Sequence, residues 1–117
     1  MKFLLSLLLA YSTFTFAAPK EAILIVKNVT FTNRLVDGKK TWLPATAKFK
    51  AGQKVEIKLV NTLSEPHGFS MPGLIEDIIV NSGETKSINF TPKNAGTFPF
   101  KCQLHPAHVG GSITIES

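Results

Sequence analysis

The single cysteine of this 117-residue chain lies in a short segment that also holds two of its three histidines. Cys102, His105 and His108 follow one another at intervals of three residues, and His67, the remaining histidine, comes much earlier in the chain. Thiolates and imidazoles bind soft and borderline metal ions. Three ligands so near in sequence hold a metal from one side only. We therefore expect the rest of the chain to be a scaffold that brings His67 to residues 102–108.

The first residues have the pattern of a secretion signal. Lys2 provides a positive start, residues 3–11 form an apolar run, and Thr15–Ala17 offers small residues at the positions that signal peptidase reads. The apolar run is shorter than the roughly 20 residues of a membrane-spanning helix. We predict a signal peptide at residues 1–17 and a single exported domain at residues 18–117, periplasmic if the source is a Gram-negative bacterium.

Export bears on the lone cysteine. In an oxidising compartment one cysteine cannot form an internal disulfide, and a free thiol is a liability. A bound metal would protect Cys102, and the histidines beside it could share that metal. The alternative is that Cys102 is a small buried apolar side chain, which is common for free cysteines.

Short alternating segments indicate strands. In residues 53–61 the apolar side chains Val55, Ile57 and Leu59 alternate with charged ones, which is the period of a strand with one buried face. Residues 85–91 alternate in the same way, and turn residues separate the segments. With no long helical period, this pattern predicts an all-β fold, an antiparallel β-sandwich.

Other segments are less regular. We expect a first strand at residues 22–26, a loop or hairpin at residues 28–40, and either a strand or a short helix at residues 74–80. Pro99 costs a ladder hydrogen bond, so its strand should be irregular or at a sheet edge there.

The alternation of strand residues also predicts which way the side chains of the candidate ligands point. Phe98, Phe100 and Cys102 share one face, so the thiol should point inward at the end of a strand. His67 shares its parity with Phe69 and Met71; Met71 could offer a thioether, but we expect it in the core. We also hypothesise that the Gly68 N–H donates to the Cys102 sulfur.

Several segments resemble the cupredoxin family: residues 61–71, 83–91, 95–98 and the run 102–106, Cys-Gln-Leu-His-Pro. The resemblance implies a Greek-key cupredoxin sandwich and a mononuclear copper site, with one ion in the Cu(I) and Cu(II) states. It is greatest to nitrosocyanin, which has a glutamate where this chain has His67 and a longer ligand loop. The short spacing from Cys102 to His108 is similar to that of amicyanin, whose last position is methionine.

The expected metal ligands are thus His67, Cys102, His105 and His108, with His108 in the axial position. A histidine nitrogen binds more strongly than a thioether, so we expect a weakened blue band and a green, yellow or red colour. His67 could instead be a surface or core residue, and His108 could face solvent. Zinc would also accept this ligand set, although copper has the higher affinity.

The resulting functional prediction is one-electron transfer through a copper site. A copper carrier or storage protein, or nitric-oxide-type binding as in nitrosocyanin, are the alternatives. We see no acid–base pair or nucleophile arrangement and predict no enzyme activity, nor any nucleic-acid partner. A redox protein or a copper donor or acceptor could dock on an apolar patch, and a homotrimer is implied by resemblance only. The docking patch would comprise Leu104, Pro106, Ala107 and Val109.

The net charge of +5 comes from basic side chains that crowd into the first half of the chain. Such a surface could steer an acidic partner toward the protein. The simpler interpretation is that these side chains are the solvated face of the strands.

Overall fold

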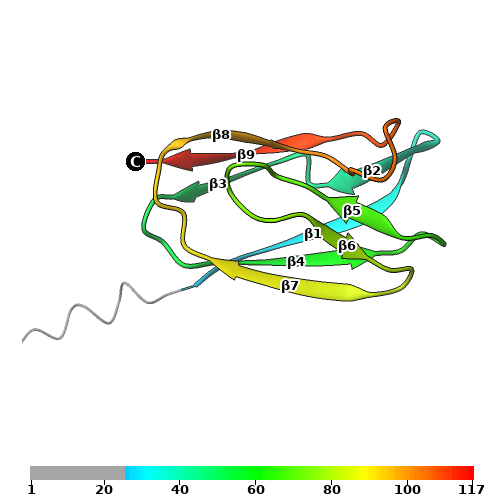
Figure 1. Ribbon diagram of the computed structural model, residues 1–117, viewed down its shortest axis with the longest axis horizontal. Coiled ribbons are helices and arrows are strands. Elements are labelled where there is room, and N and C mark those ends of the chain that lie inside the picture. The colour runs from blue at the N-terminus through cyan, green and yellow to red at the C-terminus, as the bar shows by residue number, and fades with distance from the viewer. Residues whose placement is uncertain (1–25) are drawn as a thin grey trace, which may run out of the picture.

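The computed structural model describes residues 26–117, which form nine strands joined by loops (Figure 1). No helix among these residues is long and apolar enough to cross a membrane. The predicted signal peptide and most of the strand predicted at residues 22–26 lie outside the described residues. The strands are β1 (Lys27–Val36), β2 (Lys39–Leu43), β3 (Thr46–Lys50), β4 (Val55–Asn61), β5 (His67–Phe69), β6 (Ile78–Val80), β7 (Thr85–Phe90), β8 (Gly96–Phe100) and β9 (Gly111–Glu116).

Two main sheets face each other. One has the strand order β2-β1-β4-β7 and the other β3-β9-β8, while β5 and β6 form a separate two-stranded ribbon (Figure 1). The predicted β-sandwich is confirmed, but its sheets are mixed: β1 pairs in parallel with β4, and β3 pairs in parallel with β9. The other strand pairs are antiparallel. Parallel neighbours need a long connection, which is how distant segments of this chain become adjacent.

The core lies between the sheets. Val55, Ile57 and Leu59 of β4 are buried, as the alternation predicts, and Ile113 and Ile115 of β9 are buried with them. Each such side chain contributes about 1.5–3 kcal/mol when it leaves water.

Aromatic rings extend the core toward one end of the sandwich. Phe31 contacts both Phe69 and Phe100, and Phe69 also packs edge-on against Trp42. Because β5 carries Phe69 two residues after His67, this packing holds the histidine strand against the main sheets.

The region expected to be a loop or hairpin is a hairpin. β1 and β2 are antiparallel and joined by Asp37 and Gly38, both at positive φ (51° and 77°). Positive φ at both turn residues is the geometry that matches the twist of a two-residue hairpin. Of residues 74–80, only Ile78–Val80 is a strand.

Two loops meet at one end of the sandwich. The loop that follows β8 and the β1–β2 hairpin lie side by side there (Figure 1). The Val109 N–H donates to the Lys40 carbonyl at 2.9 Å, and Val109 also forms a bridge with Thr41. The segment that holds three of the candidate ligands is therefore anchored on β2.

Candidate metal centre

The loop after β8 presents Cys102 and His105. Lys101 is tied to Ser70 by backbone hydrogen bonds in both directions, at 2.7 and 2.9 Å, so the chain leaves the sheet at a fixed point. The His105 N–H then reaches the Cys102 carbonyl at 3.4 Å, and the His108 N–H reaches the His105 carbonyl at 3.0 Å. These two turns match the three-residue spacing of the ligands. Pro99 lies in β8, which is at one edge of its sheet, as predicted.

β5 presents His67. The strand pairs with β6, with His67 opposite Val80, and all three of its residues are buried. Its middle residue is held on both sides: the Trp42 indole N–H donates to the Gly68 carbonyl at 2.8 Å, and the Gly68 N–H donates to Cys102 Sγ at 3.2 Å. The hypothesised contact between Gly68 and the cysteine sulfur is thus present. A thiolate that accepts an N–H bond is stabilised.

His67, Cys102 and His105 form a compact cluster. One donor atom from each lies within 4.8 Å of the other two. Both histidines turn Nδ1 toward the sulfur, at 4.0 Å for His67 and 3.4 Å for His105. His67 and Cys102 are buried, whereas the His105 side chain keeps 30% of its surface exposed. Of the three side chains, only that of His105 is therefore accessible to solvent to a substantial degree.

His108 lies beside this cluster but outside the group of mutually close donor atoms. Its ring centre is 5.3 Å from that of His67. Its Nε2 lies 2.7 Å from Asn33 Oδ1, and its Nδ1 lies 3.0 Å from the Val109 carbonyl oxygen. Both ring nitrogens thus contact protein oxygens.

The hydrogen bonds of Asn61 orient the His108 ring. The Asn61 amide NH₂ donates to the carbonyls of Glu65 and Val80, so its oxygen accepts from Asn33 Nδ2. The Asn33 oxygen then faces His108, and His108 Nε2 must be the donor. Nδ1 is therefore the nitrogen by which His108 would bind a cation, and that bond would replace its contact with Val109.

Burial favours the neutral form of two candidate ligands, His67 and His108. Desolvation lowers the pKa of His67 to about 4, and the nearby positive charges of His105, His108 and Lys40 act in the same direction, against Glu65. Burial also lowers the pKa of His108. A neutral imidazole has the free lone pair that a metal needs.

Glu65, which the sequence pattern does not distinguish from other loop carboxylates, lies next to the cluster. Its carboxylate forms an ion pair with Lys40, which lowers the pKa of Glu65. The same oxygen, Oε1, lies 3.5 Å from His105 Nε2 and 3.9 Å from His67 Nε2. The sequence offers one indication of this position, namely that Glu65 lies two residues before His67. The ion pair with Lys40 of β2 joins segments far apart in the chain, so no local pattern predicts it.

Met71 is fully buried in the core, as expected.

The residues present fit a copper ion. Two imidazole nitrogens and one sulfur converge, which is the trigonal ligand set of blue-copper sites. A backbone N–H, that of Gly68, already contacts the sulfur. Such outer contacts orient metal ligands and tune the metal.

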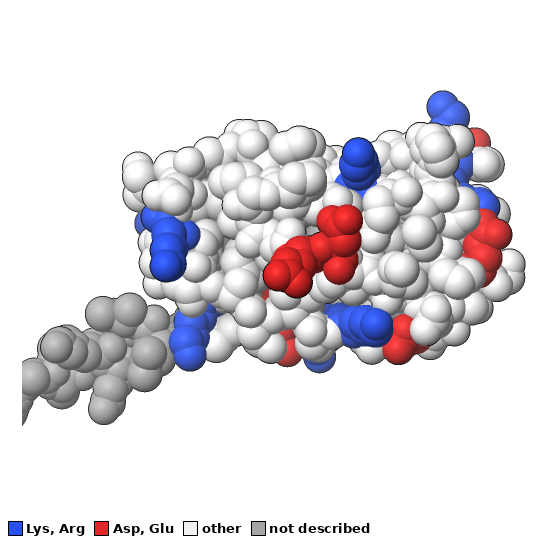
Figure 2. Space-filling model, in the orientation of Figure 1, with Lys and Arg blue, Asp and Glu red and all other residues white. Residues whose placement is uncertain are grey.

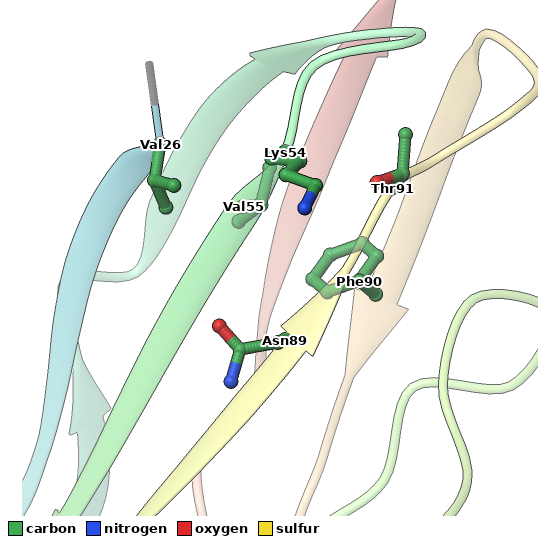
Figure 3. A pocket seen from close by; sticks show the side chains of 6 residues that line it. All are labelled: Val26, Lys54, Val55, Asn89, Phe90 and Thr91. Atoms are coloured by element: carbon green, nitrogen blue, oxygen red, sulfur yellow. The ribbon is translucent and has the colours of Figure 1, made fainter. Parts of the chain in front are cut away.

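The surface around the cluster contains a pocket of about 490 Å³. It is lined by Gly38, Lys39, Lys40, His105, Pro106, Ala107, His108 and Val109. Another pocket, of about 320 Å³, opens at the ends of β4 and β7, remote from the loop after β8 (Figure 3). Among the residues labelled there, only Lys54 carries an ionisable side chain, so this second pocket offers no comparable chemistry.

Charges are scattered over the face seen in Figure 2. Lysine and arginine side chains are separated by uncharged surface, and acidic side chains lie between them. This face of the described residues has no continuous basic patch.

The model of the cupredoxin-like domain family matches residues 3–115. The chain belongs to this family. The predicted family is therefore confirmed. The match covers all but the last residue of the nine strands, and it includes the cluster of this cupredoxin-like protein.

Solved structures share the fold of this cupredoxin-like chain. A copper nitrite reductase from Nitrosomonas europaea is 20% identical, with a TM-score of 0.66 over 79% of this chain and 42% of its own. A copper binding protein in the apo form is 20% identical, with a TM-score of 0.58 over 78% and 88%. Auracyanin B is 15% identical, with a TM-score of 0.60 over 78% and 89%. The chain spans less than half of the reductase. No curated protein sequence matches it.

Proposed function

We propose that this cupredoxin-like protein is exported, binds one copper ion and passes single electrons to and from a redox partner. The observation that carries the proposal is the convergence of one donor atom each from His67, His105 and Cys102 within 4.8 Å, with Nδ1 of both histidines turned toward the sulfur. His108 is the proposed fourth ligand. The ion supplies a one-electron couple. The chain itself holds the donors in place.

Rigid support of the donors suits electron transfer. His67 lies on β5 and Cys102 in the loop after β8, but the two are linked through Gly68, whose own carbonyl is fixed by Trp42. The donors should therefore move little when the charge at the site changes. A small rearrangement favours fast electron exchange, because little energy is spent on moving ligands and solvent.

The exposed edge of His105 is the proposed route for the electron. Leu104, next to it in sequence, and Val109, four residues further on, are 41% and 38% exposed. With Pro106 and Ala107 they form the apolar docking patch proposed for a partner. Apolar side chains that remain exposed around a site are typical of interaction surfaces.

The test is electrochemical. Copper-loaded protein should show reversible one-electron reduction and fast self-exchange, with a spectrum assigned by visible and electron paramagnetic resonance measurements. Cys102→Ser and His105→Ala should abolish the cysteine-to-copper band. A copper-loaded protein that cannot be reduced would exclude the proposal.

A second candidate is a copper carrier, favoured by the exposure of His105 at the edge of a pocket. A carrier should release copper quickly to a competing chelator, whereas an electron-transfer site should release it slowly. Nitric-oxide binding, suggested by the resemblance to nitrosocyanin, needs a free coordination position. A spectral response to nitric oxide that His108→Ala enhances would support that alternative.

A further inference from the structure

Glu65 faces the Nε2 side of the His67 and His105 rings, opposite the Nδ1 side that faces the Cys102 sulfur. Its Oε1 atom is 3.5 Å from His105 Nε2 and 3.9 Å from His67 Nε2, and it also pairs with Lys40. The two rings are close to each other, with centres 4.6 Å apart. One carboxylate oxygen thus faces three nitrogen atoms.

Both rings need an acceptor on that side. If Nδ1 binds a metal, the proton of a neutral imidazole must be on Nε2. His67 Nε2 is buried and has no hydrogen-bond partner, and the side chain as a whole is inaccessible to solvent. A buried N–H without an acceptor costs about 1–3 kcal/mol. Glu65 is the acidic group nearest to this atom.

The carboxylate is held in this place by the backbone and by β2. The Glu65 carbonyl accepts a hydrogen bond from Asn61 Nδ2 at 2.8 Å, which fixes the chain just before His67. Lys40 is anchored through its own carbonyl by the Val109 N–H at 2.9 Å. The ion pair therefore connects the hairpin, the loop before β5 and the ligand loop.

We propose that Glu65 is a positioning residue for the copper ligands His67 and His105, and that Lys40 limits the negative charge that reaches them. This inference rests on the proposed copper site. A small shift of the rings brings their Nε2–H groups onto Glu65 Oε1, so the carboxylate selects the tautomer and orientation in which Nδ1 faces the metal. Carboxylates behind metal-binding histidines raise ligand basicity in this way.

Glu65 and Lys40 should then have opposite effects on the reduction potential. A negative charge behind the rings favours Cu(II) over Cu(I), because it makes the imidazoles stronger donors and offsets the larger positive charge. Glu65 should therefore lower the potential. Lys40 neutralises part of that charge and should raise the potential. A purely structural contact would not predict two opposite signs.

The test compares Glu65→Gln and Lys40→Met with the wild-type protein. Glu65→Gln should weaken Cu(II) binding roughly 10-fold to 100-fold, as loss of such partners does elsewhere. If Cu(I) binding is unchanged, each tenfold loss raises the potential by about 59 mV. Lys40→Met should shift the potential the other way. Potentials are measured by voltammetry and affinities by chelator competition.

Glu116→Gln is the matched control. Glu116 also pairs with a lysine, Lys48, and its side chain is 49% exposed against 43% for Glu65. Its removal should leave the potential unchanged. Circular dichroism and thermal unfolding of the copper-free variants establish that each is folded.

The outcomes separate this inference from the copper proposal. If wild-type protein binds no copper, the proposed function fails first. If it binds copper through Cys102 and His105, but Glu65→Gln and Lys40→Met both match the wild-type potential, only the inference on Glu65 is overturned. Shifts in the same direction for both variants would also overturn it, since that indicates a general loosening of the site.

Discussion

The Gly68 N–H donates to Cys102 Sγ at 3.2 Å across 34 residues of sequence. This bond joins the strand of one candidate ligand to the sulfur of another. Gly68 also lies directly against the Gln103 side chain, and a Cβ at position 68 would collide with the Gln103 amide. The close approach, rather than an unusual backbone angle, is what requires glycine here.

Gly68→Ala should therefore disturb the cluster. The new methyl group would displace the Gln103 amide, which now donates to the Ile78 carbonyl at 3.2 Å. Loss of that bond should lower the free energy of unfolding by about 1 kcal/mol or more and alter the spectrum of the copper-loaded protein. Urea unfolding and visible spectroscopy measure the two effects.

The double variant Gly68→Ala/Gln103→Ala is the control. It removes the colliding amide, so the original spectrum should return, whereas the stability contributed by the bond to Ile78 should remain lost. If the spectrum of the double variant is as perturbed as that of Gly68→Ala, then the collision with Gln103 is not the cause.

The copper-free protein should lose stability as the pH falls from about 6.5 to about 4. The pKa of His67 is lowered from 6.5 to about 4 in the folded state. Between these pH values the imidazole is protonated in the unfolded chain but not in the folded protein, so protonation favours unfolding. At 1.36 kcal/mol per pKa unit the loss approaches about 3 kcal/mol. His108, whose pKa is also lowered, acts in the same direction.

Urea unfolding at several pH values measures this dependence. Acidic groups also lose their charge in the lower part of the window, so the informative comparison is with His67→Gln. The free energy of unfolding of that variant should depend less steeply on pH, and the difference in slope should correspond to about one bound proton. Equal slopes for the two proteins would contradict a buried, neutral His67.

Asn33→Leu should destabilise the fold. Asn33 is fully buried and links His108 Nε2 to Asn61 Oδ1, so its loss leaves a buried ring nitrogen without an acceptor. We expect a loss of about 1–3 kcal/mol in chemical unfolding. Asn28→Leu, at an exposed asparagine of the same strand, should be nearly neutral. A neutral Asn33→Leu would mean that the bond to His108 contributes little.

Trp42→Phe should weaken the support of His67. The substitution removes the hydrogen bond from the indole to the Gly68 carbonyl and leaves a small cavity beside Phe69. A loss of about 2 kcal/mol in unfolding free energy is expected, together with a broadened copper spectrum. Phe49→Leu, at a buried core residue of β3, should reduce stability without changing the spectrum.

The regular strands were predictable because alternation is a local property. The buried face of β4 follows directly from the placement of Val55, Ile57 and Leu59. The parallel pairing of β1 with β4 was not predictable, since alternation determines which side chains are buried but not which strands become neighbours. β1, which begins at Lys27, carries mostly polar residues, so apolar content alone does not indicate it.

The residue types alone indicate the donor chemistry, because a cysteine and histidines at three-residue intervals are typical of a site for soft and borderline metal ions. The tertiary structure decided which of their atoms meet. It turned Nδ1 of His67 and His105 toward the sulfur, tied His108 to Asn33, and set Glu65 and Lys40 behind the rings. These contacts join strands far apart in sequence, so they depend on how the sheets pack and not on any local pattern.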